Sequence, residues 1–324
     1  MLKSKDRDSY FDNCKYLLIL FVVLGHAIEP LIKSSSIIFT AYSIMYLFHM
    51  PCFIFITGYF MRRTKNISKA VIKYTKIYII VQTIYFIVIK YFMNYASIKL
   101  TYSNPYFTYW FLFALISWYI VFPYLKDIKS FIFISIILGI LIGYDTAFGR
   151  FLSASRIMFF MPFFAFGYYG KKEWLLYLKN SKLKYLIVFF CICLAIFIYN
   201  DNTIINRSLL YGYQSYKAMG FDVWYAGFYR LVVYILQIIF SLTFFLLIPE
   251  KKMFYSNFGK NTLYPYVTHG IILKCMQIKG FYDIAKDELL YQILLIIFSI
   301  VYTTLLCTFR IKLHKVNSIP NANS

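Results

Sequence analysis

Apolar residues occur in long runs along this sequence, and short charged or turn-forming segments separate the runs. A membrane-spanning helix needs about 20 mostly apolar residues, and unbroken runs favour helices over strands, in which apolar and polar positions alternate. The pattern predicts an all-α integral membrane protein with about ten transmembrane helices in a single bundle. The fifth, sixth and ninth runs are short enough for tilted, broken or partly re-entrant helices. The expected spans are residues 16–32, 39–60, 77–92, 107–125, 131–144, 157–169, 183–199, 231–248, 263–276 and 289–309.

The composition agrees with this class and excludes others. Of the 324 residues, 61% are apolar and 15% are charged, and the mean hydropathy is +0.64. Soluble domains have about 45–50% apolar and about 25% charged residues. An ordinary soluble enzyme, a disordered chain and a disulfide-stapled secreted domain are therefore excluded. The unbroken apolar runs also argue against a β-barrel.

The positive charge lies mostly between the apolar runs. A formal net charge of +21 would suggest a nucleic-acid partner in a soluble protein, but here lipid head groups account for it and no nucleic acid is expected. With the N-terminus inside, 23 Lys and Arg residues fall on the inner side and 11 on the outer side. The positive-inside rule then predicts that both termini are cytoplasmic. We expect one transmembrane domain over residues 1–310 and a polar C-terminal tail over 311–324.

Three histidines lie within predicted spans. An ionisable side chain at membrane depth is costly and is therefore a candidate for function at the interior of the bundle. His49 precedes Met50-Pro51, where proline frees a backbone carbonyl, and His269 precedes Gly270. For His49 and His269, a structural role as a hydrogen-bonding contact between helices is an equally good interpretation.

His26 has a neighbour that favours catalysis. Glu29 follows at i+3 on the same helical face, where its carboxylate can hold the imidazole in one tautomer and stabilise its protonated form. A base oriented in this way is what activation of a hydroxyl requires. The alternative for Glu29 is that it marks the outer membrane surface.

Cations lie at the expected inner ends of the first two spans. Asp12 and Lys15 precede the first span, and Arg62 and Arg63 follow the second. They fit either positive-inside anchors or a site for a phosphate-rich donor, because Arg binds phosphate as a fork and Lys as a point charge. The sequence contains no CxxC pair, so no metal is expected.

Two arginines flank the short segment before the sixth span. Arg150 and Arg156 lie on the side that is poor in positive charge, where they can bind a polar acceptor or stabilise an oxyanion. Snorkelling to lipid phosphate is the alternative. The segment 200–230 is rich in aromatic residues, which fit either sugar stacking or an interfacial belt.

Several segments together resemble the acyltransferase 3 family of membrane O-acyltransferases, and more narrowly its fucose 4-O-acetylase-like branch. They follow one another in the family's order over most of the chain. The family has an Arg, ten residues and then a His, whereas this chain has Lys15, ten residues and His26. The segments read YFDNCK (10–15), VVLGH (22–26), LFHMPCFIFITGYF (47–60), WFL (110–112), GRFLSASR (149–156), PFFAFGYY (162–169) and GKNTLYPYVTHG (259–270).

The resemblance implies transfer of an acetyl group from cytosolic acetyl-CoA, a co-substrate, to a hydroxyl of a cell-surface or lipid-linked polysaccharide sugar, as in capsule or exopolysaccharide. It implies that His26 is catalytic, that Lys15, Arg62 and Arg63 bind the donor, and that His49 and Arg156 line the site, in a multi-pass protein of the bacterial plasma membrane. From the residue arguments above, we add Glu29 as a catalytic candidate, Asp12 on the donor side, and Arg150 and His269 on the acceptor side. A transporter of polysaccharide or lipid-linked sugar, and an acyltransferase using another donor such as succinyl-CoA, are the alternatives. The oligomeric state is not predicted.

Overall fold

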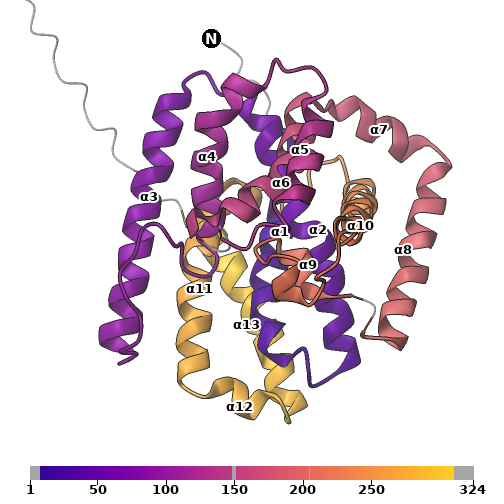
Figure 1. The fold of residues 1–324 in the computed structure, drawn as a ribbon. Helices are drawn as coiled ribbons and strands as arrows, with labels where there is room; N and C mark the ends of the chain where they lie inside the picture. The colour runs from indigo at the N-terminus through magenta and orange to yellow at the C-terminus, as the bar shows by residue number, and fades with distance from the viewer. Residues whose placement is uncertain (1–7, 148–150, 204, 310–324) are drawn as a thin grey trace, which may run out of the picture.

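The computed structural model describes residues 8–147, 151–203 and 205–309, and every regular element in these ranges is helical. Figure 1 shows a bundle in which α1 and α2 lie at the centre and α3 and α8 lie at opposite sides. The helices are α1 (Ser9–Ile28), α2 (Ser36–Met61), α3 (Ile67–Ile87), α4 (Trp110–Leu125), α5 (Phe131–Leu141), α6 (Ala154–Tyr169), α7 (Lys172–Asn180), α8 (Leu183–Asn200), α9 (Arg207–Tyr211), α10 (Gly227–Leu247), α11 (Leu263–Ile278), α12 (Phe281–Ala285) and α13 (Leu289–Thr308).

Each of the ten expected spans overlaps one helix. Seven helical stretches in the described ranges are long and apolar enough to cross a membrane. The remaining three expected spans coincide with α4, α5 and α11, which have 16, 11 and 16 residues. The described chain is therefore an all-helical multi-pass protein, and the count of ten and the sidedness of the termini stay predictions. The seven stretches are Ser9–Leu31, Ser36–Met61, Ile67–Phe92, Phe151–Tyr169, Leu183–Asn200, Gly227–Leu247 and Leu289–Thr308.

Two helices begin earlier than their apolar runs because polar side chains cap them. The Tyr10 backbone N–H donates to the Asp8 side chain at the start of α1 (3.0 Å), and the Lys69 N–H donates to the Asn66 side chain at the start of α3 (2.8 Å). Such caps satisfy backbone donors that the first helical turn leaves free. Both helices consequently extend beyond the apolar stretch, and α1 brings Lys15 into the bundle.

Glycines allow α2 and α6 to pack closely. A Cβ atom on Gly58 would lie 2.1 Å from the Phe164 carbonyl oxygen, and one on Gly167 would lie 1.9 Å from the Phe55 carbonyl oxygen. No larger residue fits at either position without moving a backbone. Small residues at a contact let helices approach closely, as is common in membrane bundles. This contact fixes α2, which carries His49, against α6, which carries Arg156.

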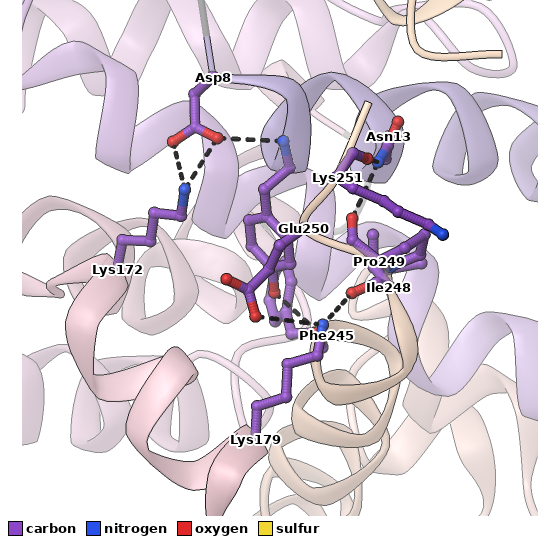
Figure 2. Close-up of polar contacts among 10 residues, drawn as sticks. Asp8, Asn13, Lys172, Lys179, Phe245, Ile248, Pro249, Glu250 and Lys251 are labelled. Carbon is purple, nitrogen blue, oxygen red and sulfur yellow. Dashed lines mark hydrogen bonds and ion pairs between the residues drawn. The ribbon is translucent and has the colours of Figure 1, made fainter. Parts of the chain in front are cut away.

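Polar contacts fix α7 to the start of α1 and to the chain that follows α10. Lys172 donates to both carboxylate oxygens of Asp8 at 2.9 and 2.8 Å, and Lys179 donates to the Ile248 carbonyl oxygen and lies 3.6 Å from Glu250 (Figure 2). Asn13 also donates to the chain after α10, at the carbonyl oxygens of residues 249 and 251. These contacts hold together the end of the bundle at which α1 begins.

The segment between α8 and α10 folds back onto the bundle. Tyr216 is buried, and its backbone N–H donates to Gly143 O (2.7 Å) while its hydroxyl donates to Ile140 O (2.8 Å). Ser155 at the start of α6 donates to Gly212 O (2.7 Å). The segment therefore forms a wall of the structure beside α5 and α6 and carries Tyr211 and Tyr213 towards the centre.

Candidate active site

Two cavities lie along α1 and α2. The His26 cavity has a volume of about 530 Å³ and is lined by His26, Glu29 and His49, among others. The Lys15 cavity has a volume of about 270 Å³ and is lined by Lys15 and Val22, among others. Along α1, the residue number rises from the Lys15 cavity to the His26 cavity. Along α2 it rises in the opposite direction, from Tyr46 in the His26 cavity to Phe60 in the Lys15 cavity.

One ring nitrogen of His26 contacts both a carboxylate and a hydroxyl group. Its Nδ1 lies 3.2 Å from Glu29 Oε2 and 3.1 Å from the Tyr46 hydroxyl oxygen. A carboxylate only accepts hydrogen bonds, so this contact places the proton of the neutral ring on Nδ1. The other nitrogen, Nε2, then keeps a free lone pair. The i+3 spacing of His26 and Glu29 thus produces the contact that a general base needs for its orientation.

His269 and His49 lie next to this pair. The ring centroids of His269 and His26 are 5.6 Å apart, with 29° between the ring planes. The Nδ1–H of His269 donates to Pro265 O (2.8 Å), and that of His49 donates to Met45 O (2.5 Å). Both rings are 1% exposed, and within the described ranges the Nε2 atom of each has no hydrogen-bond partner. Two buried acceptors are therefore available close to His26.

Arg156 lines the His26 cavity from α6. Its guanidinium lies 4.9 Å from the Trp110 ring centroid and 4.8 Å from that of Tyr213, and its Nε–H donates to Tyr211 O (3.2 Å). Cation–π contacts with two rings hold the charge at the cavity wall. The side chain therefore faces the cavity rather than surrounding lipid. Arg150 lies outside the described residues.

The aromatic residues of segment 200–230 divide into two groups. Tyr211 and Tyr213 line the His26 cavity with their rings stacked, and their centroids are 5.9 Å apart. Burial raises the pKa of Tyr211 to about 12, so its hydroxyl stays neutral at physiological pH, and it lies 2.5 Å from the Tyr42 hydroxyl. Trp224, by contrast, is 88% exposed. Only part of this aromatic set can therefore contact a ligand in the cavity.

The expected donor residues are separated in the structure. Lys15 lines the Lys15 cavity, and its Nζ lies 2.6 Å from the carboxylate of the buried Asp12. Arg62 and Arg63 are exposed: Arg62 donates to the carbonyl oxygens of residues 168 and 170, and Arg63 donates to Tyr59 OH (2.7 Å). Lys73 lines the cavity instead, although its sequence context favours a membrane anchor.

A protein-family model described as an acyltransferase domain, acyltransferase 3, matches residues 8–309. The chain belongs to the acyltransferase 3 family. No curated protein and no solved structure matches it. The two cavities, His26, Lys15 and Arg156 all lie within the matched range, so the site belongs to the domain of this membrane acyltransferase.

The side chains around the cavities of this acyltransferase 3 protein define the chemistry that the site offers. Among the described residues, no three His, Cys, Asp or Glu side chains are grouped so that they could hold a metal ion. His26, His49 and Arg156 line one cavity and offer it an oriented imidazole, a second ring nitrogen without a partner and a guanidinium, while His269 stacks on His26 without lining that cavity. That set suits proton transfer and stabilisation of a developing oxyanion, which are the two requirements of acyl transfer.

The helical spacing of several α2 residues is a sequence signal for further residues of this site. Tyr46, His49 and Phe53 repeat at the spacing of one helical face, and this face of α2 lines the cavities. Tyr46 thereby reaches His26. Lys73 gave no such signal, because a lysine at the end of a membrane helix has the same sequence context whether it anchors the helix or lines a cavity.

Proposed function

We propose that this protein transfers an acetyl group from acetyl-CoA, bound from the Lys15 cavity, to a hydroxyl of a cell-surface or lipid-linked polysaccharide sugar in the His26 cavity. The observation that carries the proposal is the position of His26, which lines one cavity and lies one helical turn beyond Val22, which lines the cavity that contains Lys15. The bacterial membrane location and the fucose 4-O-acetylase-like branch belong to the same proposal.

In the proposed reaction, His26 Nε2 takes the proton of the acceptor hydroxyl. The hydroxyl oxygen attacks the thioester carbonyl, the carbon–sulfur bond breaks, and the imidazolium returns its proton to the leaving thiolate. Glu29 stabilises the imidazolium through Nδ1–H. Arg156 and His49 line the same cavity as His26 and would face the reacting groups. A transient acyl group on His26 Nε2 is the other chemical course that this geometry allows.

Donor binding in this proposal rests on charge at the Lys15 cavity. Lys15 and Lys73 line the cavity, and the exposed Arg62 and Arg63 follow α2 at the same end of the bundle. The phosphates of the donor would meet these cations, and the pantetheine arm would follow the largely apolar cavity towards Met50. Lys15 contributes a single ammonium charge, which its ion pair with Asp12 holds in position. The family pattern has an arginine here, whose guanidinium could bind phosphate through two hydrogen bonds.

Acceptor binding rests on the lining of the His26 cavity. A volume of about 530 Å³ falls in the range of sites for small ligands. Trp110, Tyr211 and Tyr213 offer ring faces on which a sugar can stack, and Gln277 and Lys274 add polar groups. The family match favours transfer of an acyl group over transport of a whole sugar. Binding of acetyl-CoA distinguishes the two functions, because only the acyltransferase requires an acyl donor.

The experiment compares His26→Ala with His314→Ala, a histidine substitution in the polar tail. We expect acetyl release from the glycan of cells with His26→Ala to fall to background at normal protein level, whereas His314→Ala retains it. Purified wild-type protein should bind acetyl-CoA. Normal O-acetylation in His26→Ala cells would refute the catalytic role, and absence of acetyl-CoA binding would favour the transporter. A comparison with succinyl-CoA tests the other donor.

A further inference from the structure

Met50 lies where the two cavities meet. Its side chain lines both the His26 cavity and the Lys15 cavity. On the facing helix α1, Val22 lines one cavity and His26 the other, and four residues of α-helix span about 6 Å. On α11, Tyr266 and Leu273 also line different cavities, and the seven residues from one to the other span about 10 Å of helix. The boundary between the cavities is therefore about one to two helical turns long, and Met50 lines both cavities at this boundary.

The Met50 side chain is flexible enough to narrow the passage between the cavities and still move aside for a small group. Met50 is half-buried and packs against two separate clusters of apolar residues. Methionine is unbranched, has three rotatable side-chain bonds and adapts to irregular gaps. It can therefore move aside for a narrow group at a low cost and close again afterwards.

We infer that Met50 is the restriction through which the acyl group enters the His26 cavity, and that it limits the size and charge of the acyl group transferred. This inference rests on the proposed function. The acyl group is the leading end of the pantetheine thioester, so it must pass Met50 before the carbonyl carbon reaches His26. The His26 cavity is about twice as large as the Lys15 cavity. Selection by size therefore acts at Met50 and not beyond it.

The surroundings of Met50 also disfavour a charged acyl group. Val22, Phe53 and Phe111 line the Lys15 cavity with it, and none of them offers a hydrogen bond through its side chain. A carboxylate passing among these side chains loses its hydration without gaining a partner. Acetyl and propionyl groups meet no such barrier, whereas a succinyl group does.

The first test measures transfer from acetyl-CoA, butyryl-CoA and succinyl-CoA by purified protein. Met50→Ala should raise the rate with butyryl-CoA relative to acetyl-CoA about tenfold, because a methylene in an apolar site changes discrimination by about 10- to 200-fold. Met50→Leu keeps the volume and should keep the wild-type ratio. Met161→Ala removes another half-buried methionine that packs on the main core, and it should also keep the ratio. An unchanged ratio in Met50→Ala overturns the inference.

A second test does not depend on enzyme activity. In sealed vesicles, Met50→Cys should react with a small charged thiosulfonate added from either side of the membrane, above the background of wild-type protein. If Met50→Cys reacts with the reagent from only one side of the membrane, the inference that Met50 lies in a passage shared by both cavities is wrong. If wild-type protein transfers no acyl group from any of the donors, the proposed function fails. If wild-type protein is active and the Met50→Ala ratio is unchanged, the inference alone fails.

Discussion

The imidazole rings of His26 and His269 lie nearly parallel with 5.6 Å between their centroids, although one is on α1 and the other on α11. Each ring has its Nδ1 atom engaged, His26 by Glu29 and Tyr46, and His269 by the Pro265 carbonyl oxygen. The Nε2 atoms of both rings are thus left as acceptors, and His26 presents its ring to the larger cavity. Substitution of Glu29 and of Tyr46, the two side chains that contact His26, should have separate, measurable consequences.

Glu29→Gln should lower kcat by about 100-fold with little change in the KM for acetyl-CoA. An amide can present its N–H to His26 Nδ1, which favours the wrong tautomer, and it cannot stabilise an imidazolium as a carboxylate does; general acid–base catalysis contributes about 10²- to 10⁴-fold. Steady-state kinetics of purified protein checks this. Glu250→Gln, which changes an exposed carboxylate near Lys179, is the matched control and should leave both constants unchanged. Equal kcat values for wild type and Glu29→Gln would contradict the role.

Tyr46→Phe should lower kcat about tenfold without loss of folded protein. The substitution keeps the ring that stacks on Tyr42 at 4.3 Å and removes the hydroxyl that contacts His26 Nδ1. The magnitude corresponds to the ~1.4 kcal/mol that a hydrogen bond to a reacting group contributes. Tyr16→Phe removes the hydroxyl bonded to Thr304 and serves as the control. Loss of activity in both variants to the same degree would indicate a general effect on packing.

Arg156→Met should raise the KM for the acceptor about tenfold or more and leave the KM for acetyl-CoA unchanged. The methionine keeps an apolar side chain between Trp110 and Tyr213 but removes the guanidinium. Initial-rate kinetics with each substrate varied in turn separates the two constants. A rise in the KM for acetyl-CoA alone would place Arg156 on the donor side and contradict the assignment.

Lys15→Ala and Lys73→Ala should each raise the Kd for acetyl-CoA by about threefold to tenfold, because a charge-assisted hydrogen bond contributes about 1.5 kcal/mol or more before screening by water. Arg62→Ala should raise it less, since Arg62 is exposed and donates to carbonyl oxygens of residues 168 and 170. Binding of acetyl-CoA by calorimetry provides the measurement. If Arg62→Ala weakens acetyl-CoA binding more than Lys15→Ala does, the assignment of Lys15 as the main donor-binding cation is wrong.

Gly167→Ala should destabilise the protein by at least about 1–3 kcal/mol, the cost of overpacking a well-packed contact. Its new Cβ atom would lie 1.9 Å from the Phe55 carbonyl oxygen, so α2 and α6 would have to separate. Thermal unfolding in detergent measures the change. Gly25→Ala, whose Cβ atom would meet Tyr46 at an ordinary 3.6 Å, should retain stability. Equal melting temperatures for both variants would contradict the close α2–α6 contact.

The helical class and the positions of the helices could be predicted because the apolar runs are long. The beginnings of α1 and α3 could not, because hydropathy reports the apolar part of a helix and not the polar turns that Asp8 and Asn66 cap. The fold of segment 200–230 was equally inaccessible, since Tyr216 is buried by contacts with α5 that no local pattern encodes.

The candidate site was predictable where it depends on one helix. The i+3 spacing of His26 and Glu29 required no tertiary information, and their contact is present. The approach of His269 and Tyr46 to His26 arises from the packing of three helices, so sequence spacing does not reveal it. The separation of Arg62 and Arg63 from the Lys15 cavity depends in the same way on where α2 ends against α6.

The most direct measurement is a single-turnover reaction of His26→Ala protein loaded with labelled acetyl-CoA and mixed with the acceptor glycan. The account predicts that acetyl-CoA binds within about twofold of its wild-type affinity, because His26 lines the other cavity, and that transfer slows by about 10³-fold, within the range of general acid–base catalysis. Transfer at the wild-type rate with normal donor binding would contradict the central claim that His26 activates the acceptor between the two cavities.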